Sequence, residues 1–171
     1  MEIQKPVFND LGSFIITKRQ QELYKAGTVW NDWLIQYPEL FDEKDRQLFR
    51  NQAHFGYGFV ESLSIIFLHN ATGYIPIFGS YGWGTQEYKN NLVKELVSEE
   101  TWGLIMSQKK HRSQPPDLFA YAPDKTNYFF CEVKGPGDRL RETQIQYFQL
   151  LQEVSGKPVY TIKYKYAPFN K

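Results

Sequence analysis

The chain has 171 residues, of which 42% are hydrophobic and 23% charged, and this size and composition predict one globular unit with a hydrophobic core. Its formal net charge of +1 excludes a protein that binds nucleic acid through overall charge, so any contact with DNA would depend on local basic patches. One cysteine excludes an internal disulfide, and a polar N-terminus without an apolar run of ~18 residues predicts an intracellular protein, cytoplasmic if bacterial or phage, with no membrane contact.

Residues from about 12 to 50 are predicted to form helices. Apolar residues recur there at roughly helical intervals, Gly27 interrupts the pattern and Pro38 ends it. The apolar positions are Phe14-Ile15-Ile16, Leu23-Tyr24, Val29-Trp30 and Trp33-Leu34. We therefore expect residues 1–50 to be a helical extension packed on a core formed by residues 51–171. No motif decides whether the extension also mediates dimerisation or recognises the shape of DNA.

Two further helices are predicted before the first strand. Residues 52–70 are strongly apolar, and Glu61 is the only acid among them. A lone carboxylate is costly to bury without a partner or a metal ion. Residues 85–99 form a charged amphipathic pattern instead, and Glu95 is one of several acids on a face typical of solvent exposure.

A β-hairpin is predicted between residues 117 and 134. Residues 117–122 and 128–134 are rich in aromatic and apolar strand formers, and the composition of residues 123–127 is typical of a turn. Side chains alternate along a strand, so Glu132 and Lys134 share one face while Cys131 and Val133 point to the other. With the turn centred near residue 125, Asp117 falls opposite residues 132 and 133. Two carboxylates and an amine are therefore expected at one end of the hairpin.

This convergence has a chemical use. Two carboxylates are suitable ligands for Mg²⁺, which completes its coordination with water and substrate phosphate. A lysine beside the ion can orient or deprotonate the attacking water, or stabilise charge on the scissile phosphate. Without the aspartate, Glu132 and Lys134 would read as an ordinary surface pair.

The residues after the hairpin predict a helix and a last strand. Gly135 and Gly137 permit a sharp turn, and residues 139–154 place apolar side chains at approximately helical spacing. Gly156 and Pro158 end that helix, and residues 159–166 form a strand that a right-handed crossover would make parallel to its neighbour. The order predicts an α/β fold with a mixed sheet flanked by helices.

The stretch from Pro116-Asp117 to Glu132-Val133-Lys134-Gly135-Pro136-Gly137-Asp138-Arg139-Leu140 and Gln144 resembles the virus-type replication-repair nuclease domain, VRR-NUC. VRR-NUC is a branch of the PD-(D/E)xK nuclease superfamily. The resemblance covers about residues 114–166 and implies a restriction-endonuclease-like core with an N-terminal helical extension.

The resemblance also implies roles for individual residues. Asp117 and Glu132 would be ligands of Mg²⁺ or Mn²⁺, together with the main-chain carbonyl of Val133. Lys134 would be the catalytic lysine. Gln144, on the helix after the hairpin, would face the site.

Nucleases of this kind often carry a further glutamate near the metal, on a helix ahead of the first strand. Glu61 and Glu95 are the two candidates. We favour Glu61 as a catalytic and metal-binding residue, because it is a lone acid in an apolar helix. Residues 75–113 would then be an insertion relative to compact family members.

Basic and aromatic residues near the motif are candidate DNA contacts. Lys109, Lys110 and Arg112 directly precede the hairpin, and Arg139 follows it, although solvated loops and a capping pair with Asp138 are equally compatible with these positions. The segment Tyr81-Gly82-Trp83-Gly84 would either expose its rings for base stacking or form a turn filled by the tryptophan.

The predicted function is a metal-dependent DNA endonuclease. By resemblance, its substrates would be branched, flapped or junction DNA in repair, recombination or phage biology. The alternatives are a restriction or defence endonuclease, and a module on a nuclease fold that binds DNA or protein without cutting. A homodimer is compatible with the sequence, which names no protein partner.

Overall fold

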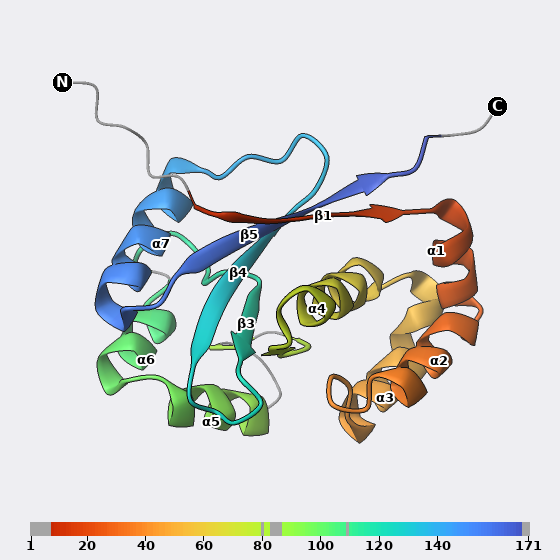
Figure 1. Ribbon diagram of the computed structural model, residues 1–171, viewed down its shortest axis with the longest axis horizontal. Coiled ribbons are helices and arrows are strands. Elements are labelled where there is room, and N and C mark those ends of the chain that lie inside the picture. Colours follow the sequence, from red (N-terminus) through yellow and green to blue (C-terminus); the bar gives the residue numbers. More distant parts are fainter. Residues whose placement is uncertain (1–7, 80, 83–86, 109, 169–171) are drawn as a thin grey trace.

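The computed structural model describes residues 8–79, 81–82, 87–108 and 110–168. These residues build one mixed sheet with the strand order β1-β5-β4-β3-β2, flanked by helices on both faces (Figure 1). The strands are β1 (Asp10–Ile16), β2 (Ile75–Pro76), β3 (Leu118–Tyr121), β4 (Tyr128–Lys134) and β5 (Val159–Tyr166). The helices are α1 (Lys18–Lys25), α2 (Thr28–Gln36), α3 (Glu43–Gln52), the 3-10 turn η1 (Ala53–Phe55), α4 (Phe59–Thr72), α5 (Glu87–Leu96), α6 (Glu99–Met106) and α7 (Glu142–Ser155).

The hairpin and the crossover that follows it are confirmed. Strands β3 and β4 are antiparallel, with Leu118 opposite Cys131 and Tyr121 opposite Tyr128. Strand β5 runs parallel to β4 and is reached through α7. The predicted α/β class with a mixed sheet is therefore correct.

The prediction of helix at the start of the N-terminal region is wrong. Residues 10–16 form β1, which pairs in parallel with β5 and extends the sheet on that side. Aromatic and β-branched residues at Phe14, Ile15 and Ile16 suit an extended strand, and the edge of β5 supplies its partner. A short apolar run is compatible with a helix or a strand. The strand that pairs with β1 lies about 150 residues further along the chain, so the local sequence does not decide between the two. The remainder of this region does form helices, α1 to α3.

Two predicted helices are also divided. The apolar run of residues 52–70 is broken by Gly56 and Gly58, whose φ angles of 87° and 79° are left-handed, so α4 begins only at Phe59. The charged region of residues 85–99 is continued by α6, a separate helix capped by the Ser98 hydroxyl, which accepts a hydrogen bond from the Thr101 N–H.

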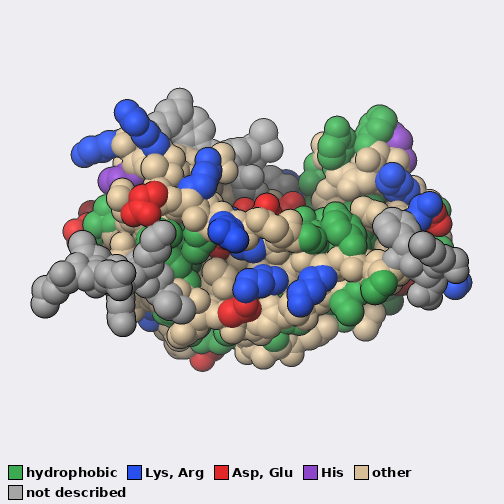
Figure 2. Space-filling view, turned by 90° about the horizontal axis from the view of Figure 1, so that it is seen from above, with side chains coloured by type: hydrophobic (Ala, Val, Ile, Leu, Met, Phe, Trp, Pro, Cys, Tyr) green, Lys and Arg blue, Asp and Glu red, His purple; other side chains and the backbone are tan. Residues whose placement is uncertain are grey.

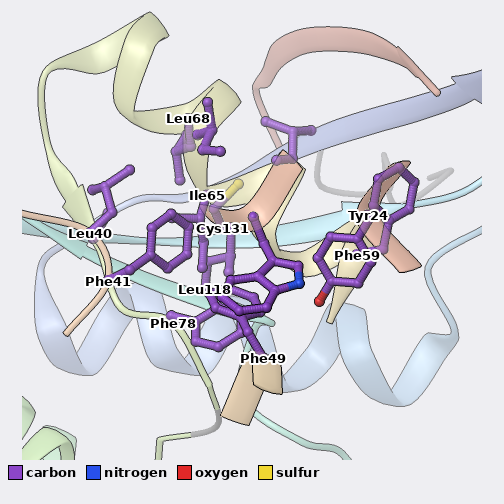
Figure 3. Close-up of a cluster of buried hydrophobic side chains, with 14 of the residues drawn as sticks. Tyr24, Leu40, Phe41, Phe49, Phe59, Ile65, Leu68, Phe78, Leu118 and Cys131 are labelled. Carbon is purple, nitrogen blue, oxygen red and sulfur yellow. The ribbon is translucent and has the colours of Figure 1, made fainter. Parts of the chain in front are cut away.

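The sheet buries apolar side chains on both faces. One core joins α1 to α4 to the sheet through large aromatic side chains, among them Tyr24, Phe49, Phe59 and Phe78, which lie in one cluster with Leu118 and Cys131 (Figure 3). The second core packs α5, α6 and α7 against the opposite face. Cys131 is fully buried, and burial raises the pKa of its thiol, so it serves as a small apolar residue. The N-terminal helices thus share a core with the hairpin that carries the predicted site.

None of the helices in the described ranges has the length and hydropathy needed to cross a membrane.

Candidate active site

Asp117 and Glu132 meet at the open end of the hairpin. The Val133 N–H donates a hydrogen bond to Asp117 Oδ2 at 2.8 Å, and the Asp117 N–H donates to Glu132 Oε2 at 3.2 Å. Each strand therefore presents a backbone donor to the carboxylate of the other. The pairing holds both acids at one end of β3 and β4.

Glu132 is held by two side chains on its other oxygen. Lys134 Nζ lies 2.8 Å from Glu132 Oε1, and Gln144 Nε2 donates to the same oxygen at 2.9 Å. Gln144 is itself positioned, because its Oε1 accepts a hydrogen bond from the Arg141 N–H at the start of α7. Only 4% of Glu132 is exposed, so this ion pair is screened little by solvent.

The surroundings of Asp117 disfavour its charged form. Removal from water and the nearby Glu132 carboxylate raise the pKa of Asp117 to about 7, although the Val133 N–H and Lys134 act in the opposite direction. Lys134 already lies against Glu132, so the pair of carboxylates carries more negative charge than the surrounding groups balance. A divalent cation between carboxylate oxygens would supply the missing charge, and the donor set fits Mg²⁺ or Mn²⁺.

Replacing Asp117 by asparagine is expected to stabilise the metal-free protein at about pH 8, by on the order of 1 kcal/mol after allowance for solvent screening. Folded Asp117 keeps its proton to a higher pH than the unfolded chain does. The wild-type protein therefore loses stability as the pH rises from about 4 to about 7, and the asparagine variant does not share this loss. Urea unfolding in EDTA at about pH 5 and about pH 8 measures the difference. Equal stabilities of the two proteins at both pH values would contradict this account.

A pocket of about 440 Å³ opens beside Asp117. Asp117 and Val133 line one side, and Val60, Glu61 and Ser64 of α4 line the other. Seen from above, the molecule is hollowed between two raised ends, with acidic side chains in the hollow and Lys and Arg side chains on the surface around it (Figure 2).

The structure places the two candidate helix glutamates very differently. Glu61 lines the pocket, and its Oε1 accepts a hydrogen bond from the Gly79 N–H at 2.8 Å. Burial raises the pKa of Glu61, and the Gly79 hydrogen bond opposes this effect. Glu95 is exposed on α5, where its Oε1 lies 3.7 Å from Lys125 Nζ. In the described ranges no three His, Cys, Asp or Glu side chains are close enough to hold one metal ion together. Glu61 and Asp117 line the same pocket.

Sequence reasoning missed a buried ion pair behind Glu61. Lys89 Nζ on α5 lies 2.7 Å from Asp45 Oδ1 on α3, and both residues are at most 5% exposed. The same amine donates to the Phe78 carbonyl, next to the Gly79 N–H that holds Glu61. The available signal was a lysine on the apolar stripe of α5, one turn before the buried Val93.

Two more pocket residues were not predicted to act there. The Tyr81 hydroxyl donates to the Pro116 carbonyl at 2.7 Å and so fixes the chain just before Asp117. Tyr81 is 4% exposed, so of the two alternatives for this segment the exposed ring is excluded at Tyr81; Trp83 and Gly84 lie outside the described residues. The side-chain amide of Gln108 lines the pocket, and its buried Nε2 has no hydrogen-bond partner among the described groups. A buried donor without a partner is costly and is suited to a polar ligand.

The predicted basic contacts lie on the surface near this pocket. Lys110 and Arg112 are exposed in the segment that leads to Gln114, a pocket residue, and Arg139 is exposed beside Asp138, which also lines the pocket. Lys109 lies outside the described residues.

The VRR-NUC domain family matches residues 79–163, a range that holds Asp117, Glu132, Lys134 and Gln144. This chain contains a VRR-NUC domain. The mixed sheet and its helices therefore have the fold of the PD-(D/E)xK nucleases. Strand β1, helices α1 to α4 and Glu61 precede the range matched to the VRR-NUC domain.

Known proteins are similar to part of this chain. A Fanconi-associated nuclease 1 homolog of Pseudomonas aeruginosa is 42% identical over 43 residues, which are 25% of this chain and 8% of the relative. Crystal structures of paFAN1 bound to gapped DNA with 2-nucleotide and 1-nucleotide 5′ flaps cover 42% and 40% of this chain, at 28% and 29% identity. Their TM-scores are 0.34 and 0.32, and the matches cover 13% and 12% of the solved chains. This chain thus spans a small part of the length of the relatives that it matches.

Proposed function

We propose that the protein is a metal-dependent DNA endonuclease. The observation that carries the proposal is the Asp117–Glu132 pair at the end of the hairpin, with Lys134 Nζ 2.8 Å from Glu132, inside a VRR-NUC domain. A decayed nuclease site usually lacks one of these three side chains, so the complete set favours cleavage over binding alone.

Asp117, Glu132 and the Val133 carbonyl would hold Mg²⁺ or Mn²⁺. When bound, the ion supplies Lewis-acid stabilisation of the phosphate and lowers the pKa of a coordinated water. Gln144 keeps Glu132 oriented through the 2.9 Å hydrogen bond to its Oε1. Lys134 orients the attacking water or stabilises negative charge on the phosphate, since its amine lies beside the carboxylates.

Glu61 is proposed to contribute from the opposite wall of the pocket. Glu61→Gln is expected to lower the cleavage rate by about 10²-fold, because a neutral amide of nearly the same volume replaces a carboxylate that would help to hold the metal ion. Glu95→Gln removes the same charge from the exposed face of α5 and is expected to leave the rate unchanged. Single-turnover cleavage with both variants measures the contrast.

If Glu95→Gln were the impaired variant and Glu61→Gln cut normally, the role would move to α5. Wild-type rates for both variants would show that neither Glu61 nor Glu95 takes part in the reaction.

The proposed substrate is branched or flapped DNA. The VRR-NUC family and the Fanconi-associated relative support this class, and a role in DNA repair or recombination is proposed on the same ground. Lys110, Arg112 and Arg139 would contact phosphates, since they are exposed cations near the pocket.

The test is cleavage of a labelled DNA panel by the wild-type protein with Mg²⁺, with Mn²⁺ and with EDTA. The panel contains a single strand, a blunt duplex, a 5′ flap, a 3′ flap and a four-way junction. Metal-dependent cutting that favours a flap or junction supports the proposal. Cutting of plain duplex at fixed sequences would instead support a restriction or defence enzyme, and no cutting of any DNA by folded protein would contradict nuclease function.

A further inference from the structure

The turn before α4 exposes a row of aromatic rings. Phe55 and Tyr57 are each 65% exposed, among the most exposed large hydrophobic residues described. The ring centroids of His54 and Phe55 are 3.8 Å apart, and those of Phe55 and Tyr57 are 6.0 Å apart. Single exposed apolar residues are ordinary, but here the Phe55 ring is paired with the rings on both sides of it, so the three rings form one exposed patch. We refer to residues 54–57 as the aromatic turn.

The backbone of the aromatic turn is fixed while its rings face outward. Gly56 and Gly58 take left-handed φ angles of 87° and 79°, which reverse the chain between η1 and α4. The Tyr24 hydroxyl donates to the Tyr57 carbonyl at 2.6 Å and ties the turn to α1. The rings are therefore presented by an ordered backbone, which lowers the entropy cost of binding a flat ligand.

The aromatic turn directly precedes, in the chain, one wall of the candidate active site. Helix α4 starts directly after Gly58, and its Val60 and Glu61 line the pocket. Standard backbone geometry places the Cα atoms of Tyr57 and Glu61 within ~9 Å of each other. A strand that enters the pocket can reach the rings within a few nucleotides.

The charges around the aromatic turn are suited to a phosphate backbone. Residues 46–60 contain two arginines and no Asp or Glu, and because Arg46 Nε lies 3.3 Å from Glu43 Oε2, Arg50 is the arginine available to a phosphate. Arg50 is exposed one helical turn before His54, and the aliphatic end of the Lys25 side chain packs against Gly56. Aromatic rings with cations beside them are the combination by which proteins bind single strands.

We infer that the aromatic turn stacks unpaired nucleobases of the DNA strand that leads to the active site. This inference rests on the proposed function and deepens it, since it selects DNA with a single-stranded segment next to the cleaved bond. Paired bases are stacked within the duplex and do not offer their faces to a protein ring.

The test measures binding in EDTA, where cleavage does not occur, by fluorescence anisotropy of three labelled DNAs. These are an oligothymidine strand, a blunt duplex, and the same duplex with a 5′ flap. Phe55→Leu and Tyr57→Leu remove the rings but keep apolar side chains, and each is expected to weaken binding of the single strand and the flap about tenfold. Binding of the blunt duplex should be unchanged. Phe55→Trp and Tyr57→Phe keep a ring and should retain wild-type affinity.

Tyr88→Leu is the matched control, because Tyr88 is 37% exposed on α5 and does not line the pocket. The new tryptophan of Phe55→Trp should also lose fluorescence when oligothymidine binds, relative to the same titration of wild-type protein.

Equal weakening of binding to all three DNAs, or no weakening for any of them, would overturn the inference even if the wild-type protein cuts flaps with Mg²⁺. So would a change from dimer to monomer in the leucine variants, because the turn would then cover a second copy. A wild-type protein that neither binds nor cuts DNA would refute the proposed function as well.

Discussion

Replacing Lys134 by alanine is expected to lower the single-turnover rate of DNA cleavage by about 10³-fold while DNA binding stays near the wild-type level. Lys134 Nζ lies 2.8 Å from Glu132 Oε1, so its positive charge lies beside the carboxylates and would lie close to a phosphate bound there. An alanine cannot orient a water or stabilise a developing charge. Cleavage at saturating DNA and binding in EDTA separate the two effects.

Lys163→Ala is the matched control for this loss. Lys163 lies opposite Lys134 in the β4–β5 register, but it is exposed and its Nζ lies 3.1 Å from Asp10. The same charge is removed one strand away, and the cleavage rate at saturating DNA should stay at the wild-type value. Lys134→Met serves as a second variant that fills more of the space of the lysine. Normal cleavage by both Lys134 variants, or an equal loss in Lys163→Ala, would exclude a catalytic role for Lys134.

Replacing Lys89 by methionine is expected to lower the free energy of unfolding by about 3–5 kcal/mol, the largest stability effect anticipated for a single change in this protein. The variant leaves Asp45, which is 1% exposed, buried without its cation. Burial already raises the pKa of Asp45 while Lys89 opposes that shift. Without the lysine, folded Asp45 would hold its proton to still higher pH, so the loss of stability should be smaller at about pH 5 than at about pH 8.

Urea unfolding at both pH values measures this effect, and the double variant Asp45→Asn/Lys89→Met is its control. The double variant removes both charges and should recover part of the stability, because no unpaired ion remains. A Lys89→Met protein as stable as wild type, or a double variant less stable than the single one, would contradict a structural ion pair. The pair also contacts the Phe78 carbonyl next to Gly79, so its loss should disturb the position of Glu61.

The part of the fold that local chemistry determines was predictable. The hairpin, the helix after it and the final strand follow from turn residues and apolar spacing within about fifty residues, and they fixed the Asp117, Glu132 and Lys134 arrangement. Gln144 was found only through the resemblance to a family, because a glutamine on a polar helix start carries no signal of its own.

The missed features depend on contacts between distant segments. The local sequence of β1 is compatible with a helix, and only the pairing with β5 makes it a strand. Asp45 is typical of a helix start, and its ion pair depends on Lys89, which lies 44 residues further along the chain. Phe55 and Tyr57 look like core residues in an apolar run, and only the left-handed Gly56 and Gly58 turn them to the surface.

The central claim is that Asp117 and Glu132 hold a metal ion that drives DNA cleavage, and one measurement tests it most directly. Wild-type, Asp117→Ala and Asp124→Ala proteins are compared for cleavage of a labelled flap DNA with Mg²⁺ and with EDTA. Asp124 is an exposed aspartate in the turn of the same hairpin, so its removal controls for loss of one negative charge. We predict cleavage with Mg²⁺ by the wild-type and Asp124→Ala proteins, and none by Asp117→Ala or in EDTA. Cleavage by Asp117→Ala at the wild-type rate, or cleavage that persists in EDTA, would contradict the claim.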